Sequence, residues 1–208
     1  MSAPMAYPVH FEVEHQERYS RLSTFFRFIL VIPHLIFLIL WGFVVEILVF
    51  LAWFAILFTG RYPRGFFNFV TAFLSYSTRV WCYSYLLTDK FPPFSGGSPD
   101  DGYPVQVSVD WPERLSRLTT FFRLFMAIPA YLVLYVLQLL ARLLAFFAWF
   151  IVVIMGRLPK GLFEVMELPQ RYQLRVTAYL FLVTDAYPWF QEETLADPAP
   201  WTGPPAAV

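Results

Sequence analysis

The sequence predicts an all-α integral membrane protein built from two tandem helical-hairpin repeats. Three observations predict it. The chain is 58% hydrophobic and only 14% charged, whereas an ordinary soluble domain is about 25% charged. It contains two apolar runs, each much longer than the roughly 20 residues that one membrane-spanning helix needs. Finally, residues 7–94 can be laid over residues 103–190 without a gap, which is the signature of a tandem duplication.

Three motifs carry the repeat. ERYSRLSTFFR (17–27) returns as ERLSRLTTFFR (113–123), AWFAILFTGRYPRG (52–65) as AWFIVVIMGRLPKG (148–161), and LLTDKFPPF (86–94) as LVTDAYPWF (182–190). Both copies keep mainly Arg, Pro, Gly, Asp and aromatic residues and vary the aliphatic ones, as expected of apolar segments that face lipid. Two other segments complete the domain organisation. Residues 95–102 form a flexible linker, and residues 191–208 form a Pro/Ala-rich tail that we expect to be disordered.

Each apolar run is interpreted as a hairpin of two helices. Glu46 is the only charged residue between Arg27 and Arg61, and Arg142 occupies the equivalent position in the second copy. The predicted legs are residues 28–40 and 43–59, on either side of Trp41-Gly42, and residues 124–137 and 139–155, on either side of Gln138. The legs reach only about 23 to 26 Å, less than the roughly 30 Å hydrocarbon core, so the hairpins are either thin or shallow.

The basic residues give the orientation. A hairpin puts Arg27 and Arg61 on the same side of the membrane, whereas a single crossing would put them on opposite sides, against the positive-inside bias. We therefore expect about four transmembrane helices, a multi-pass location in a membrane, and both termini in the cytoplasm.

Each repeat opens with a short strand and an amphipathic helix. Val9, Phe11 and Val13 alternate with polar residues, as Val105, Val107 and Val109 do, which predicts one half-buried cytoplasmic strand per repeat. Such strands are unstable alone and can pair around a pseudo-twofold axis. The following interfacial helix is expected to carry ion pairs between residues four apart, Glu17 with Arg21 and Glu113 with Arg117. It should bend into the membrane near Pro33 and Pro129.

The third apolar segment, residues 66–87 and 162–183, carries Arg79 or Arg175 near its middle. An interfacial or cytoplasm-facing helix avoids burying a cation in lipid, which would cost about 2.5 to 3.5 kcal/mol. A spanning segment, giving six helices in all, is the alternative.

The candidate site residues are charges that recur in both copies. They are Glu17, Arg18, Arg21, Arg27, Arg61, Arg79, Asp89, Glu113, Arg114, Arg117, Arg123, Arg157, Arg175 and Asp185. Such arginines can grip lipid phosphates, or they can hold the fold, for example through a pair between Asp89 and Arg61 or Arg79. Duplication favours the structural interpretation, because a contact that holds the fold must recur in each copy.

Glu46 and Arg142 form a candidate intramembrane pair. They occupy equivalent positions with opposite charges, and an unpaired charge at membrane depth costs several kcal/mol. A bridge between them would lock the two repeats together. The alternative is that both side chains snorkel to the outer interface.

The sequence offers no enzyme chemistry. His10, His15 and His34 have no counterparts in the second copy, so we expect interfacial histidines rather than a metal or catalytic site. No phosphate loop, catalytic triad, CxxC pair or HExxH motif is present, and we expect no cofactor. The single Cys82 excludes an intramolecular disulfide, and the net charge of zero argues against a nucleic-acid partner.

The spaced motifs YPV, ERxSRLxTFFR, IPH, AWFxxxxTGRYPxG, RVxxY and LLTDxxPPF together resemble a bacterial membrane family, domain of unknown function 4389. The resemblance covers nearly the whole chain, twice over. The second copy departs from it at Ala130, Met155 and Trp189. The resemblance implies a small integral protein of a bacterial inner membrane, and the family carries no assigned activity.

We therefore expect a non-enzymatic integral membrane scaffold, or an accessory subunit of a larger bacterial inner-membrane complex. Its expected partners are membrane lipids and other integral membrane proteins or further copies of itself. The alternatives are a lipid-binding or lipid/ion transport protein and a membrane-shaping homo-oligomer. The apolar runs contain few polar residues, which argues against a transport function.

Overall fold

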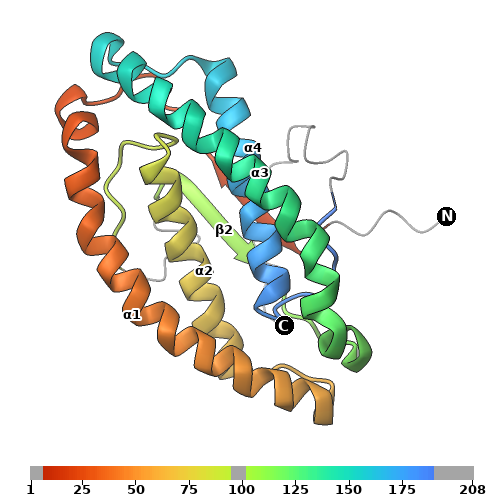
Figure 1. Ribbon diagram of the computed structural model, residues 1–208. Helices are drawn as coiled ribbons and strands as arrows, with labels where there is room; N and C mark the ends of the chain where they lie inside the picture. Colours follow the sequence, from red (N-terminus) through yellow and green to blue (C-terminus); the bar gives the residue numbers. More distant parts are fainter. Residues whose placement is uncertain (1–6, 95–101, 190–208) are drawn as a thin grey trace.

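The computed structural model describes residues 7–94 and 102–189. Its elements are β1 (Val9–Val13), α1 (Arg21–Thr59), α2 (Arg64–Ser84), β2 (Val105–Val109), α3 (Arg117–Met155) and α4 (Lys160–Leu180). In Figure 1, α2 is seen between the two long helices α1 and α3, and α4 crosses behind α3. The predicted linker, apart from Gly102, and the predicted tail lie outside the described residues.

Each apolar run forms one uninterrupted helix, so the predicted hairpins are wrong. α1 and α3 each contain 39 residues, a length of about 58 Å. α1 passes through Trp41 and Gly42 without a break, because one glycine costs a helix interior only about 1 kcal/mol. The helix ends at Gly60, which has the left-handed φ of 72° typical of a helix C-terminus. α3 passes through Gln138 in the same way, and the predicted bends at Pro33 and Pro129 lie inside continuous helices.

The predicted pairing of the two short strands is confirmed. β1 and β2 form an antiparallel two-stranded sheet in which Phe11 lies opposite Val107, its own counterpart in the other repeat. The pseudo-twofold axis therefore passes through this residue pair. The valines and Phe11 lie on one face of the sheet, whereas His10 and Glu12 lie on the other because successive side chains alternate.

The two repeats exchange their strands. β1, from the first repeat, packs on α4, and β2, from the second, packs on α2. The hydroxyl of Tyr7 donates to the carbonyl of Ala186 (3.2 Å), and that of Tyr103 donates to the carbonyl of Lys90 (2.8 Å). Each repeat thus completes the core of the other.

The long helices run antiparallel and meet at both ends. The amide of Tyr19, just before α1, donates to the carbonyl of Gly156 at the end of α3 (2.9 Å). At the opposite end, the amide of Leu115 donates to the carbonyl of Gly60 (2.9 Å). The indole of Trp53 adds a bond to the carbonyl of Thr120 (3.1 Å), and its counterpart Trp149 bonds Thr24. These contacts close the helix pair into the frame seen in Figure 1.

The elements stack in three layers. α2 and α4 contact each other, and each contacts one strand. α1 packs on α2, α3 packs on α4, and the two long helices contact each other. The main core lies between the sheet and the long helices and includes Val70, Leu74, Val105 and Leu174. Among the described residues, two helices, α1 and α3, are long and apolar enough to cross a membrane. The sequence predicted about four membrane helices, and two helices in the described residues have the length and composition of a membrane span. The third segment of each repeat forms the middle layer.

Gly156 provides a test of the helix frame. We expect Gly156→Ala to lower the free energy of unfolding by roughly 1 to 2 kcal/mol, because φ is +70° and the new Cβ would lie 3.2 Å from Nε of Arg21. Gly161→Ala is the matched control, since its Cβ meets nothing within 4 Å and alanine suits a helix better. Thermal unfolding in detergent measures both. Equal melting temperatures would contradict a role for Gly156 in the frame.

Candidate functional site

The turn after α2 forms a binding site for an arginine side chain. The amide of Leu86 donates to the carbonyl of Tyr83 (3.2 Å), and the amide of Leu87 donates to that of Cys82 (2.9 Å), the pattern of a Schellman motif. Leu86 adopts a left-handed φ of 63°, which costs a non-glycine residue about 1 to 2 kcal/mol. Burial of its side chain, which is 2% exposed, offsets that cost. Leu182, with a φ of 65°, repeats the turn after α4.

Arg27 of α1 grips this turn. Its Nη1 donates to the carbonyls of Tyr83 (2.6 Å) and Thr88 (3.1 Å), and its Nη2 forms an ion pair with Oδ1 of Asp89 (2.6 Å). Its Cζ lies 4.3 Å from the centre of the Tyr83 ring. The other carboxylate oxygen of Asp89 accepts from the amide of Ser20 at the start of α1 (2.8 Å). We call this arrangement the Arg–Asp lock. It joins the start of α1 to the end of α2, where a cation is favoured by the helix dipole.

The second repeat contains the same lock. Arg123 donates to the carbonyls of Tyr179 and Thr184 (2.7 Å each) and pairs with Asp185, which accepts from the amide of Ser116 (2.6 Å). The predicted partners of Asp89, Arg61 or Arg79, are therefore wrong, and the partner is Arg27. Sequence spacing could not identify it, because the two residues are far apart in the chain. The only sequence signal for the pair was that both copies keep FFR, which ends at Arg27 or Arg123, and TD, which ends at Asp89 or Asp185.

Arg79 and Arg175, the cations of the third segment, are buried against the exchanged strands. Cζ of Arg79 lies 4.9 Å from the ring centre of Tyr103, and Cζ of Arg175 lies 4.4 Å from that of Tyr7. Each pair joins one repeat to the other. These cations face the protein interior, which explains how α2 and α4 carry them without exposing charge to an apolar surface.

The remaining duplicated charges are exposed at the two ends of the helix frame. The first basic end contains Arg18, Arg21, Arg157 and Lys160. The second contains their counterparts Arg114, Arg117, Arg61 and Arg64, brought together by the bond between Leu115 and Gly60. The first basic end, with Glu17 and His15, lines an open hollow of about 810 Å³.

The predicted helical ion pairs at these ends are not formed. α1 begins at Arg21 with Ser20 as its N-cap, so Glu17 precedes the helix and has no partner one turn away. Glu113 likewise precedes α3, which begins at Arg117. Both glutamates are exposed.

Glu46 and Arg142 are not brought together. Both side chains are exposed, and no ion pair joins them among the described residues. The end contacts place Pro33, rather than Glu46, level with Arg142, an offset of about 20 Å along the helix. The antiparallel frame separates these positions, whereas the predicted bridge required them to meet at the twofold axis.

The histidines take three different places. His34, expected at the interface, is instead fully buried, with Nδ1 at 2.7 Å from the Tyr76 hydroxyl and its ring stacked at 4.4 Å on Phe94. His10 lies 3.3 Å from a carboxylate oxygen of Asp110, and Nε2 of His15 lies 3.1 Å from the carbonyl of Leu158. Within residues 7–94 and 102–189, no group of His, Cys, Asp and Glu could hold a metal ion.

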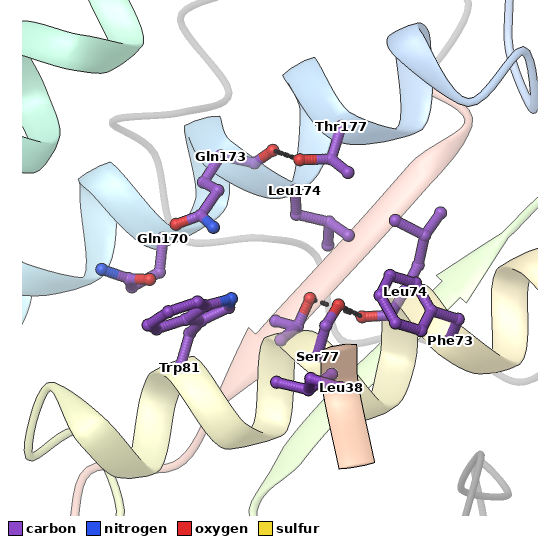
Figure 2. A pocket seen from close by; sticks show the side chains of 10 residues that line it. Leu38, Phe73, Leu74, Ser77, Trp81, Gln170, Gln173, Leu174 and Thr177 are labelled. Carbon is purple, nitrogen blue, oxygen red and sulfur yellow. Dashed lines mark hydrogen bonds between the residues drawn. The ribbon is translucent and has the colours of Figure 1, made fainter. Parts of the chain in front are cut away.

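A small cavity of about 160 Å³ lies between α2 and α4. Figure 2 shows Trp81 of α2 and Gln170 of α4 on facing sides of it. Gln170 is 2% exposed, and its Nε2 has no hydrogen-bond partner among the described residues. The neighbouring Gln173 accepts a 2.6 Å bond from Gln138. The volume suits a few water molecules, each of which occupies about 30 Å³ in the liquid.

The largest surface feature is an apolar stripe on each long helix, opposite the buried side. On α1 it consists of Leu22, Phe25, Ile29, Ile32, Ile36, Leu40, Phe43, Ile47, Phe50, Phe54 and Phe58. On α3 it consists of Leu118, Phe121, Phe125, Ile128, Leu132, Val136, Leu139, Leu143, Phe146, Phe150 and Ile154. We call these the outward stripes. All of these side chains are exposed, from 40% to 77%. Each stripe is about 54 Å long at 1.5 Å per residue.

The Arg–Asp lock should be structural. We expect Arg27→Gln to lower the free energy of unfolding by about 3 to 5 kcal/mol, because it leaves the Asp89 carboxylate and two carbonyls without their donor. Asp89→Asn and Asp185→Asn should each lower stability or membrane yield by less, since an amide oxygen can still accept. Arg18→Gln, at an exposed site, is the control and should change stability by no more than about 0.5 kcal/mol. A lock variant that melts normally but loses lipid or partner binding would assign the lock to a binding site.

Charge reversal tests the separation of Glu46 and Arg142. We expect the effects of Glu46→Arg and Arg142→Glu on the melting temperature to add in the double variant, because the sites share no contact. Recovery of stability in the double variant, beyond the sum of the singles, would instead show that the two charges meet.

Comparison with known proteins identifies the repeated unit. The family model described as "Domain of unknown function (DUF4389)" matches the chain twice, over residues 21–96 and 117–192. No curated protein and no solved structure matches it. Each match begins at the start of a long helix and contains the arginine, the aspartate and both carbonyls of an Arg–Asp lock. The two matches together cover most of the chain. The chain therefore belongs to the DUF4389 family, as a tandem duplication of its domain.

Proposed function

We propose that the chain is a non-enzymatic membrane scaffold that serves as an accessory subunit of a larger complex in the bacterial inner membrane. The observation that carries the proposal is the pair of outward stripes. Of the most apolar 18-residue stretch of each long helix, only 11% is buried within the protein in α1 and 22% in α3. The core helix of a soluble protein would be mostly buried.

The stripes require an apolar environment. A soluble monomer rarely exposes a contiguous apolar patch of more than a few hundred Å². Here two stripes, each about 54 Å long, lie on helices that contact each other. Lipid chains provide such an environment along the whole length of both helices. They also accept varied aliphatic side chains, which agrees with the different aliphatic residues at equivalent positions of the two copies.

The structural roles of the buried charged residues support the scaffold proposal. Arg27, Arg123 and their aspartates hold the helix ends, and Arg79 and Arg175 hold the exchanged strands. Charges of this kind stiffen the fold. The polar face of the sheet and the exposed basic ends are left as surfaces that a partner can contact. A cytoplasmic position of both termini stays a prediction from the distribution of basic residues.

A lipid-binding function is the second candidate, favoured by the hollow at the first basic end. Exposed arginines and a lysine around an open hollow suit a phosphate headgroup. The cavity between α2 and α4, at about 160 Å³, is too small for a lipid and gives a transport path no support.

A membrane extraction followed by a pull-down tests the scaffold proposal. We expect the full chain to stay in native membranes through a high-pH wash, because the stripes are held by lipid. After mild detergent extraction it should copurify with a membrane partner in a fixed ratio.

A matched pair of variants gives the control. Phe43→Glu puts a charge on the outward stripe of α1 and should reduce membrane yield, whereas Ser108→Glu, on the polar face of the sheet, should not. Release of the chain by the high-pH wash would contradict membrane residence. A chain that remains in the membrane but purifies alone would contradict the accessory role.

A further inference from the structure

We infer that the protein lies flat in one leaflet of the bilayer, with α1 and α3 parallel to the membrane plane and both basic ends on the phosphates of that leaflet. This inference rests on the proposed membrane residence and deepens it. The outward stripes lie among the acyl chains, α2 and α4 lie at the headgroup level, and the sheet faces the cytoplasm.

Symmetry supplies the first argument. The twofold axis runs perpendicular to the sheet, since it keeps the apolar faces of both strands on the same side. A twofold rotation leaves the height of every atom along its axis unchanged. The start of α1 therefore lies at the height of the start of α3, and the latter contacts the end of α1. Both ends of α1 thus lie at one height, and the long helices run across the axis.

The polar face of the sheet fixes the direction of the membrane normal. The axis has the sheet at one pole, with His10, Glu12, Gln106 and Ser108 on its outer face, and the long helices at the other pole. If the axis is the membrane normal, this face points into water and the stripes point into lipid. If α1 and α3 crossed the bilayer instead, the axis would lie in the membrane plane. The polar face would then sit at the middle of the bilayer, where charged and polar side chains are costly to place.

Length gives a second argument. A stripe of about 54 Å exceeds the hydrocarbon core of roughly 30 Å by about 24 Å. An upright helix would leave exposed phenylalanines and leucines outside the core at one end or both. A helix in the membrane plane keeps all of them at the same depth.

The basic ends give a third argument. Each end exposes four cationic side chains, and the two ends are related by the twofold axis. A spanning helix pair would place four of these cations on the outer side, against the positive-inside bias. In the flat orientation all eight lie at one surface, where each is attracted to anionic phosphates.

The lone charges of the apolar runs fit the same orientation. Glu46 shares its side of α1 with Gly42, Val49 and Trp53, which are half-buried, so it lies a quarter turn from the buried side and not on the outward stripe. Arg142 lies equivalently on α3. From these flanks both side chains can reach the headgroup level along the edge of the helix, as long charged residues do near an interface.

Labelling of introduced cysteines in membrane vesicles tests the inference. Arg18→Cys and Arg61→Cys, at opposite ends of α1, are expressed as full chains and treated with a membrane-impermeant maleimide in inside-out and right-side-out vesicles. We expect both introduced cysteines to react from the cytoplasmic side and neither to react from the other side. The unmodified chain is the control, because Cys82 is buried and burial raises the pKa of its thiol.

Spin labels give a second, independent readout. Ile32→Cys, Phe43→Cys and Phe54→Cys all lie on the outward stripe, with spacings of about 16 Å. In phosphatidylglycerol-containing vesicles, collision with oxygen and with a water-soluble nickel complex should report the same depth at all three. Melting curves of the labelled chains check that each variant is folded.

The outcomes separate this inference from the proposed function. Labelling of Arg18→Cys and Arg61→Cys from opposite sides, or a label at Phe43 much deeper than those at Ile32 and Phe54, overturns the flat orientation while leaving membrane residence intact. Release of the chain in the high-pH wash overturns the membrane proposal itself. Labelling from one side with equal depths supports both.

Discussion

The Arg–Asp lock is the contact on which the architecture depends. It fixes the end of a 21-residue helix to the start of a 39-residue helix in each repeat, and so sets the angle at which α2 returns along α1. Its cation satisfies two carbonyls at a helix C-terminus, and its anion satisfies an amide at a helix N-terminus. Buried pairs of this kind often add little net stability, because desolvation offsets their attraction. Their contribution here is geometric, because the contacts of Arg27 and Asp89 hold the start of α1 against the turn after α2.

Exchange of the strands converts two locked repeats into one domain. Without β2 and the preceding Tyr103, α2 would lose the cover of Val105 and the ring that contacts Arg79. Without the reciprocal bonds at Gly60 and Gly156, the long helices would have no fixed spacing. A single repeat would leave the face of α2 and the ends of its long helix without these contacts. Two repeats are the smallest assembly in which all of them are made. The duplication supplies that pair within one chain.

Much of the fold follows from the sequence, and the failures have physical causes. The duplication, the strands and their pairing were predictable because period and composition are local signals. The hairpin was wrong because it was inferred from the length of the run and from the positive-inside bias of its flanking arginines, without a signal that ends a helix. Nothing at Trp41-Gly42 ends a helix as Gly60 and the nearby proline do. The lock partner was missed because Arg27 and Asp89 are separated by two helices. His34 was misplaced because its aromatic neighbours, Tyr76 and Phe94, come from distant segments.

The orientation argument shows how the same charges can support two arrangements. The basic residues flank each apolar run, which a hairpin explains by returning the chain to its starting side. A continuous helix does not return, so either the charge bias is broken or the helix never leaves that side. In the proposed flat orientation the helix never leaves that side, because the end contacts put both ends of α1 at one height along the twofold axis. The charge bias and the uninterrupted helix are then both satisfied by a helix that lies in the plane of the membrane.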